Sequence, residues 1–202
     1  MTLIAVLDYG IGNLRSAQKA LEHVGADARL TADPGLVRDA AAVVLPGVGA
    51  FGRCMEALRA SALEPVVHEA VESGRPFLGI CVGMQLLYEG SEENPEAVGL
   101  GVLPGKVRRL SEGVKRPQMQ WNVLDVVRPC PLFDGFPPEA WVYFVHSFAA
   151  DDETNAVATC DYGGPVCAAV ARDNVYATQF HPEKSAANGL HLLANFVSMA
   201  AS

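Results

Sequence analysis

The chain has 202 residues, of which half are apolar, and carries a formal net charge of −8 at pH 7. A chain of this length can bury one large hydrophobic core, so we expect a single domain over residues 1–202. The acidic balance, with no cluster of Lys or Arg, argues against a surface for nucleic acid or for anionic membranes.

The first half of the chain alternates apolar strand-like runs with amphipathic helical segments. Strands are predicted at 3–7, 26–31, 42–45 and 77–80, and helices at 14–24, 52–60, 63–73 and 82–89. The first run is too short for a signal peptide and has no basic flank, and no stretch approaches the ~18 apolar residues of a membrane helix. The alternation is typical of a parallel sheet covered on both faces by helices.

After about residue 100 the pattern changes to short strand-like pieces separated by Gly, Pro, Asp and Asn. These pieces lie at 101–110, 119–127, 141–145, 156–161, 165–171 and 174–180, and an amphipathic helix is predicted at 186–200. We therefore expect an α/β fold: three layers, with a doubly wound, mostly parallel sheet that carries antiparallel additions.

The five cysteines argue for a reducing compartment, so we expect a cytoplasmic protein. Their number is odd and they form no Cys-x-x-Cys pair, which argues against a disulfide framework and against a zinc site. Cys160 and Cys167 lie in strand-like runs and are predicted to be small buried apolar residues. Cys54 and Cys130 have no suggestive neighbours, so only Cys81 has unusual surroundings.

Cys81 lies in a segment with the form strand, Gly-x-Cys-x-Gly, helix. This is the nucleophile-elbow pattern with Cys in place of Ser, and a tight turn of this kind needs the small neighbours Gly79 and Gly83. Backbone N–H groups at a helix start favour a thiolate and can stabilise an oxyanion. A buried cysteine in a Gly-rich turn is the alternative, because a nucleophile also needs a base.

His181 is the candidate base, and Glu183 is the candidate acid behind it. In an extended chain, residues two apart point to the same side, and Pro182 disfavours a helical conformation at His181. A carboxylate there would select the imidazole tautomer and stabilise the imidazolium. The alternative is a histidine at a strand end beside a solvated glutamate. This alternative is less favoured because His181 and Cys81 both follow strands, and the carboxyl ends of parallel strands meet at one edge of the sheet.

A third segment, residues 45–52, follows a strand and contains three glycines in six residues. Glycines free backbone N–H groups to face a ligand, so this segment is a candidate oxyanion loop beside the elbow. An ordinary strand–helix turn is the alternative.

Residues 79–85 together with His181-Pro182-Glu183 resemble the triad (class I) glutamine amidotransferases. Within that family, residues 8–14, 46–51, 143–147 and 179–185 are similar to the glutaminase subunits that serve histidine biosynthesis. The resemblance implies a doubly wound fold, glutamine as the substrate and no cofactor. It also implies a heterodimer with a (β/α)8-barrel cyclase, which would use the ammonia to form imidazole glycerol phosphate and an aminoimidazole carboxamide ribotide.

The resemblance also implies roles for individual residues. Cys81, His181 and Glu183 would be catalytic, and the backbone N–H groups of Val48, Gly49 and Val82 would hold the oxyanion. Gln85 lies one helical turn after Cys81 and could bind the α-amino or α-carboxylate group of the substrate. His146 and Ser147 are assigned to the glutamine pocket by resemblance only. The expected partner contacts are Tyr9, Asn13, Met119, Trp121 and Lys184.

One position departs from the family pattern: Gln120 stands where a glycine is usual in Pro-x-Met-Gly-Trp-Asn. If that glycine needs a positive φ or a close backbone approach, we expect an altered partner contact here. Three alternatives remain open. They are a glutaminase that serves pyridoxal phosphate, anthranilate or purine synthesis; a cysteine peptidase or dienelactone-type hydrolase, which usually places the acid elsewhere in sequence; and a non-catalytic subunit that keeps only the fold.

Overall fold

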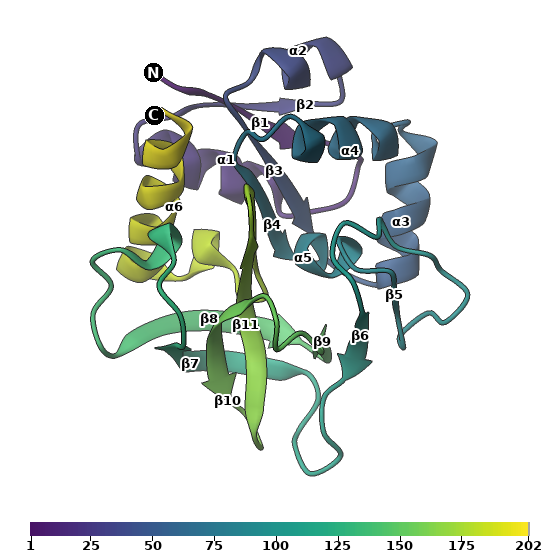
Figure 1. The fold of residues 1–202 in the computed structure, drawn as a ribbon, viewed down its shortest axis with the longest axis vertical. Coiled ribbons are helices and arrows are strands. Elements are labelled where there is room, and N and C mark those ends of the chain that lie inside the picture. Colours follow the sequence, from purple (N-terminus) through teal and green to yellow (C-terminus); the bar gives the residue numbers. More distant parts are fainter. Residues whose placement is uncertain (202) are drawn as a thin grey trace.

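A nine-stranded sheet with helices on both faces organises the chain in the computed structural model, which describes residues 1–201 (Figure 1). Its first five strands are parallel, in the order β2 (Asp27–Thr31), β1 (Leu3–Leu7), β3 (Ala42–Gly47), β4 (Phe77–Cys81) and β12 (Val175–Thr178). The sheet continues in antiparallel pairing through β11 (Pro165–Arg172), β10 (Ala156–Asp161), β7 (Gln118–Val126) and β8 (Ala140–His146).

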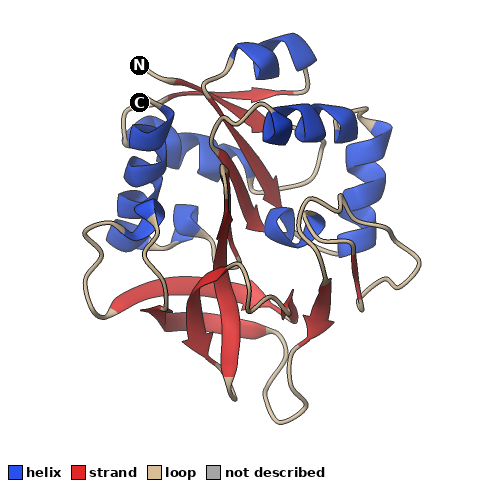
Figure 2. Ribbon diagram, viewed as in Figure 1, coloured by secondary structure: helices blue, strands red, loops and turns tan. Residues whose placement is uncertain are grey.

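A second, three-stranded sheet consists of β5 (Gly90–Ser91), β6 (Lys106–Arg109) and β9 (Phe148–Ala150). The α-helices are α1 (Leu14–His23), α2 (Pro34–Asp39), α3 (Phe51–Ala60), α4 (Glu64–Glu72), α5 (Val82–Leu86) and α6 (Ala186–Ala200), and short 3₁₀ turns occur at Pro131–Phe133 and Pro182–Lys184. Helices α1 and α6 contact each other on one face of the main sheet, and α3 and α5 lie on the other (Figure 2).

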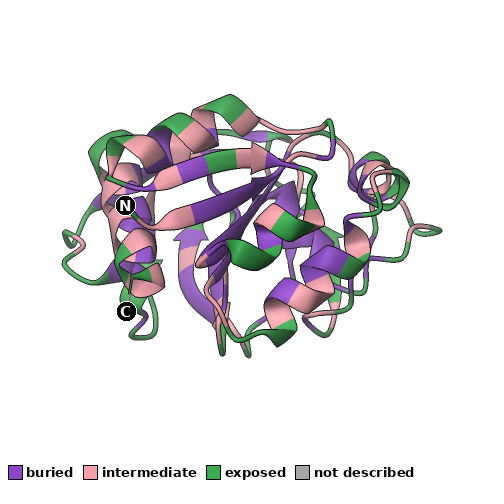
Figure 3. Cartoon of the chain, turned by 90° about the horizontal axis from the view of Figure 1, so that it is seen from above, coloured by how far each residue is buried: buried purple, intermediate pink, exposed green. Residues whose placement is uncertain are grey.

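The central strands are buried because both faces of the sheet are covered. Every residue of β3 and of β4 is buried, and such strands consist of nearly continuous apolar runs. Figure 3 shows these buried strands inside a shell of helices whose outer sides are exposed. The predicted three-layer, doubly wound α/β fold is therefore confirmed.

Several predicted bounds differ from the structure. Helix α2 was not predicted, although Asp33 caps it by accepting a hydrogen bond from the Gly35 N–H and Pro34 occupies its first position. Strands β5 and β9 were also missed, and of the predicted strand 101–110 only Lys106–Arg109 is a strand.

The helix predicted at 82–89 ends at Leu86. The carbonyls of Leu86 and Leu87 accept hydrogen bonds from the N–H groups of Leu100 and Leu103. A distant loop thus satisfies carbonyl groups that the end of a helix leaves without an intrahelical partner.

Glycines allow α5 to approach the ends of β3 and β4 closely. A Cβ at Gly83 would lie 1.9 Å from the Leu45 carbonyl oxygen, and one at Gly47 would lie 2.5 Å from the Gly83 nitrogen. At Gly79 a Cβ would lie 3.0 Å from the Gly83 carbonyl oxygen. The small size predicted to be necessary at Gly79 and Gly83 is therefore required by backbone contacts.

Among residues 1–201, no helix is long and apolar enough to cross a membrane.

We expect the Gly83→Ala substitution to lower the free energy of unfolding by about 3 kcal/mol, because the new methyl group would overlap the backbone of β3. Denaturant unfolding measures this change. The matched control is Gly113→Ala, where a Cβ would meet no atom within 4 Å, and its effect should stay within about 0.5 kcal/mol. Equal stability of the two variants would contradict the close packing described for α5.

Candidate active site

Cys81 occupies a strained turn between β4 and α5. Its backbone has φ 55° and ψ −112°, a conformation that non-glycine residues rarely adopt. In the parallel register, Gly47 of β3 pairs with Cys81, and Thr178 of β12 pairs with Ile80. The candidate oxyanion loop and the His181 segment therefore follow the two strands that flank β4, next to Cys81.

His181 and Glu183 are in direct contact, and the distance between Nδ1 and Oε1 is 2.8 Å. Both side chains are only 2% exposed. The expected reason for this contact was wrong in part: His181 is extended, but Pro182–Lys184 forms a 3₁₀ turn. The carboxylate reaches the ring because the chain turns back, and not because an extended strand alternates its side chains.

Backbone contacts fix the position of the His181 ring relative to β8. The His181 N–H donates to the Tyr143 carbonyl at 3.0 Å. The Ser185 hydroxyl donates to the His181 carbonyl at 2.6 Å and accepts from the Tyr143 N–H at 3.0 Å. Ser185 is buried and cross-links these segments; the sequence analysis did not identify it, because only the folded chain brings residues 143 and 185 together.

The pKa of His181 reflects opposing effects. Burial alone would lower it, but hydrogen bonds and charge interactions with Cys81 and Glu183 dominate and raise the pKa of His181 to about 9. A protonated imidazole between a sulfur and a carboxylate favours the thiolate. The arrangement is therefore suited to nucleophilic attack by Cys81 with His181 as the proton carrier.

Asn13 contacts Glu183 on the side away from Cys81. Its Nδ2 donates to Oε1 of Glu183 at 3.3 Å, so the two donors on Glu183 share one oxygen. The second oxygen, Oε2, is buried without a hydrogen-bond partner among the described residues. Asn13, expected at the partner interface, thus also supports the acid.

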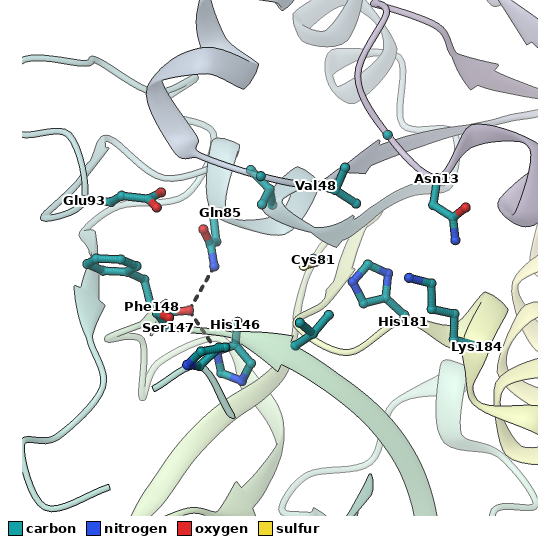
Figure 4. A pocket seen from close by; sticks show the side chains of 15 residues that line it. Asn13, Val48, Cys81, Gln85, Glu93, His146, Ser147, Phe148, His181 and Lys184 are labelled. Atoms are coloured by element: carbon teal, nitrogen blue, oxygen red, sulfur yellow. Dashed lines mark hydrogen bonds between the residues drawn. The ribbon is translucent and has the colours of Figure 1, made fainter. Parts of the chain in front are cut away.

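The segments that follow β3, β4 and β12 line a cavity of about 530 Å³, which is large enough for an amino-acid-sized ligand (Figure 4). In the figure, His181 and Lys184 lie on one side of Cys81, and Gln85, Glu93, His146 and Phe148 lie on the other. The cavity brings together most of the predicted site residues, namely Asn13, Val48, Gly49, Cys81, Val82, Gln85, His146, Ser147, His181 and Lys184.

Two buried side chains hold the carbonyl groups of the oxyanion loop. The Tyr9 hydroxyl donates to the Pro46 carbonyl at 2.6 Å, and the Cys54 thiol donates to the Val48 carbonyl at 3.2 Å. Burial raises the pKa of the Tyr9 hydroxyl and of the Cys54 thiol, so both stay neutral near Cys81. Tyr9 is only 5% exposed, so its side chain supports this loop from within, and its contact with a partner stays a prediction. Cys54, which seemed featureless in sequence, lies beneath this loop.

At the other end of the cavity, buried polar groups form a continuous network. The Phe148 carbonyl accepts hydrogen bonds from Gln85 Nε2 and His146 Nδ1, each at 2.9 Å. Gln85 Nε2 also donates to Gln179 Oε1 at 3.0 Å. Burial lowers the pKa of His146 to about 4, so this ring is neutral at pH 7.

Glu93 is a lining residue that the sequence analysis missed. Its Oε2 accepts a hydrogen bond from the Phe51 N–H at 2.8 Å, at the start of α3. No motif surrounds Glu93 in the sequence, and its place on the cavity wall depends on the loop after β5. A carboxylate at this end of the cavity is suited to bind a cationic group.

Comparison with known proteins gives a consistent result. The model of the family described as "Glutamine amidotransferase class-I" matches residues 5–200. Imidazole glycerol phosphate synthase subunit HisH of Syntrophotalea carbinolica is 51% identical, over 98% of this chain and 100% of that protein. The subunit of the same name from Geobacter sulfurreducens is 50% identical, also over 98% and 100% of the two chains.

Solved structures share the fold at low sequence identity. The structure of PurLQS from Thermotoga maritima matches with a TM-score of 0.79 and 22% identity, over 98% of each chain. A structure described as a glutamine amidotransferase matches with a TM-score of 0.77 and 24% identity, over 98% of this chain and 99% of the other.

We expect the Glu183→Gln substitution to lower the pKa of His181 by about one to two units, because the neutral amide no longer stabilises the imidazolium. Titration of the ring resonances by NMR measures this shift. Glu139→Gln, a change at an exposed position, is the control and should leave the titration unchanged.

The raised pKa of His181 also makes the free energy of unfolding depend on pH. Folding raises this pKa from 6.5 to about 9, so the stabilisation is complete below about pH 6.5 and is lost as the pH rises through about 9. Glu183→Gln should weaken that dependence. An unaltered decline in unfolding free energy between these pH values would show that His181 is not its source.

Proposed function

The chain belongs to the class-I glutamine amidotransferase family, and on that basis we propose that it is the glutaminase subunit of an imidazole glycerol phosphate synthase in histidine biosynthesis. The observation that carries the proposal is the line of contacts from Glu183 through His181 to Cys81 at the wall of the cavity. The identity of about one half over nearly the whole chain with HisH subunits supports this choice within the family. We also propose that residues 1–202 form one domain.

The first chemical step is attack by the Cys81 thiolate on the δ-amide carbon of glutamine. A carbon–sulfur bond forms, and the amide oxygen takes the negative charge of a tetrahedral intermediate. Backbone N–H groups of Val82, at the elbow, and of Val48 and Gly49, in the oxyanion loop, are the donors proposed for that oxygen. All three residues line the same cavity as the sulfur.

His181 then carries the protons. It donates a proton to the departing nitrogen as the carbon–nitrogen bond breaks, which releases ammonia and leaves a γ-glutamyl thioester on Cys81. The neutral ring next removes a proton from water, whose oxygen attacks the thioester carbon. The carbon–sulfur bond breaks, and glutamate and the thiolate are formed. Glu183 holds the ring with Nε2 toward the sulfur, because its carboxylate occupies the Nδ1 side.

The cavity end opposite His181 is the proposed binding site for the α-amino and α-carboxylate groups of glutamine. Gln85 uses Nε2 to donate to Phe148 and Gln179, so its Oε1 is the atom that remains to accept from a substrate ammonium group. Glu93 supplies a negative charge on the same wall. His146 supports this end by fixing the Phe148 carbonyl, and Ser147 lines the cavity beside it.

A synthetic partner follows from the chemistry of the product. Ammonia in neutral water is mostly ammonium, which has no lone pair for attack, so it must reach its acceptor before it is protonated. We place a (β/α)8-barrel cyclase over the cavity mouth, close to Asn13 and Lys184. Both of these residues line the cavity, and Lys184 is exposed.

An exposed apolar patch beside this mouth, formed by Met119 and Trp121 on β7, is the proposed docking surface. Met119 is 62% exposed and Trp121 is 43% exposed. Val145, which pairs directly with Met119 across β7 and β8, lines the cavity, so the patch is adjacent to the site. Trp121 packs edge-on against Tyr143 at a centroid distance of 6.1 Å, which holds the indole ring in place.

Gln120 lies within β7, paired with Phe144, and it is not among the residues with positive φ. Any residue can adopt the backbone conformation at this position, so a positive φ gives no reason for the partner contact to differ here.

We expect Cys81→Ala to abolish release of glutamate from glutamine, because no other cysteine lines the cavity. The assay measures glutamate with the cyclase and its nucleotide ligand present. Affinity for the cyclase should be unchanged, since Cys81 is only 3% exposed. Glutamate release by the variant at the wild-type rate would refute the nucleophile assignment.

We expect Trp121→Ala to weaken binding of the cyclase by about 2 kcal/mol, or some thirtyfold in Kd, as for a central aromatic anchor. Isothermal titration calorimetry measures the change. The matched control is Val98→Ala, which shortens another exposed apolar side chain outside β7 and β8. If both variants bind like the wild type, the docking surface lies elsewhere.

A further inference from the structure

A second polar side chain reaches the sulfur of Cys81. Gln179 follows β12 directly, is completely buried, and places Nε2 at 3.8 Å from the Cys81 Sγ. We propose that Gln179 is a further catalytic residue, whose amide N–H stabilises the Cys81 thiolate and connects it to the glutamine-binding Gln85. This inference rests on the proposed glutaminase function and adds a residue to its site.

The orientation of the Gln179 amide is fixed by a backbone carbonyl. The Phe148 carbonyl can only accept hydrogen bonds, so the group that Gln85 presents to it must be the NH₂ group. The second N–H of that group points to Gln179, which must therefore present its oxygen. The Gln179 NH₂ group consequently faces the sulfur. A chain of three donors and acceptors thus determines which end of Gln179 meets Cys81.

Burial makes the stability of the Cys81 thiolate depend on the Gln179 N–H. Water cannot replace a donor at a completely buried position, and a sulfur anion with fewer donors is less stable relative to the thiol. Because Gln85 holds the Gln179 carbonyl, the donor is already oriented before the thiolate forms. The proposed role is thus to hold the sulfur in its anionic form, beside the protonated His181.

Few other ionisable groups surround Cys81. From the segment after β12 it faces His181, which is backed by Glu183. From the loop after β1 it faces Tyr9, and from α3 it faces Cys54, both kept neutral by burial. The more distant groups on the cavity wall are Glu93, His146 and Lys184. Among residues 1–201, Gln179 and His181 are thus the two side chains that hydrogen-bond the sulfur.

The test measures how readily Cys81 ionises in two variants of the full chain. Gln179→Met keeps the length of the side chain but removes both donor and acceptor. Gln179→Glu keeps the shape and replaces the donor with an oxygen. The readout is the pH dependence of the rate of alkylation of Cys81 by iodoacetamide, since only the thiolate reacts.

All five cysteines are buried, so mass spectrometry of the labelled peptide assigns the alkylation rate to Cys81. Burial raises the pKa of Cys54 and Cys130, of Cys160 to about 11 and of Cys167 to about 12, which slows their own alkylation at neutral pH.

We expect Gln179→Met to raise the midpoint of the alkylation profile by about one pH unit, and thereby to slow alkylation about tenfold below that midpoint. Gln179→Glu should raise it further. In the complex with the cyclase, the acidic limb of kcat/KM for glutamine should shift by the same amount. An unchanged midpoint in Gln179→Met overturns the proposal, even if Gln179→Glu shifts it, because the donor would then have no effect.

Asn174→Leu is the matched control. Asn174 directly precedes β12, at the end opposite Gln179, and its Nδ2 donates to the carbonyls of Val71 and Arg75, so the substitution removes partly buried hydrogen bonds far from Cys81. It should lower the unfolding temperature to a similar extent without moving the Cys81 midpoint; a shift equal to that of Gln179→Met would assign the effect to general loosening and overturn the proposal. If the wild-type chain releases no glutamate with the cyclase, the glutaminase function fails, and the alkylation profiles still decide the role of Gln179 at the sulfur.

Discussion

The close approach of α5 to the ends of β3 and β4 is the constraint on which the site depends. A Cβ at Gly83 or Gly47 would collide with backbone atoms of the facing segment, so this approach needs glycine at both positions. Cys81, between β4 and α5, has a positive φ. The strained turn directs the sulfur into the cavity between the segments that follow β3 and β12. Backbone geometry, enforced by packing, thus provides the position that the proposed chemistry uses.

Charge in the cavity is concentrated on a few groups because burial keeps their neighbours neutral. Tyr9 and Cys54 retain their protons, and His146 does not gain one at pH 7. His181 is the exception: contacts with Cys81 and Glu183 outweigh its burial and raise its pKa. The opposite fates of two buried histidines follow from their partners, since His146 faces a carbonyl and an amide whereas His181 faces a sulfur and a carboxylate.

The same loops that build the cavity also face outward, which relates the proposed hydrolysis to the proposed delivery of ammonia. Asn13 both supports Glu183 and lines the cavity, and Val145 lies between the cavity and the apolar patch of Met119 and Trp121. A partner seated on that patch would cover the mouth. Substrate binding, nucleophile activation and docking would then share neighbouring residues, and this allows one event to influence the others.

The sequence by itself determined the alternating α/β fold, the elbow at Cys81 and the Gly-rich loop, because each is encoded in a local pattern of apolar residues and glycines. It also predicted the contact of His181 with Glu183, although a 3₁₀ turn and not an extended strand brings the two together. Only the tertiary structure decided the rest. Glu93 lies in no motif, and the motif at 179–185 does not reveal which atoms Gln179 and Ser185 contact. Tyr9 proved to be buried beneath the candidate oxyanion loop. The physical reason is that hydrogen bonds between residues about 40 to 100 positions apart depend on strand order and register, which local patterns do not specify.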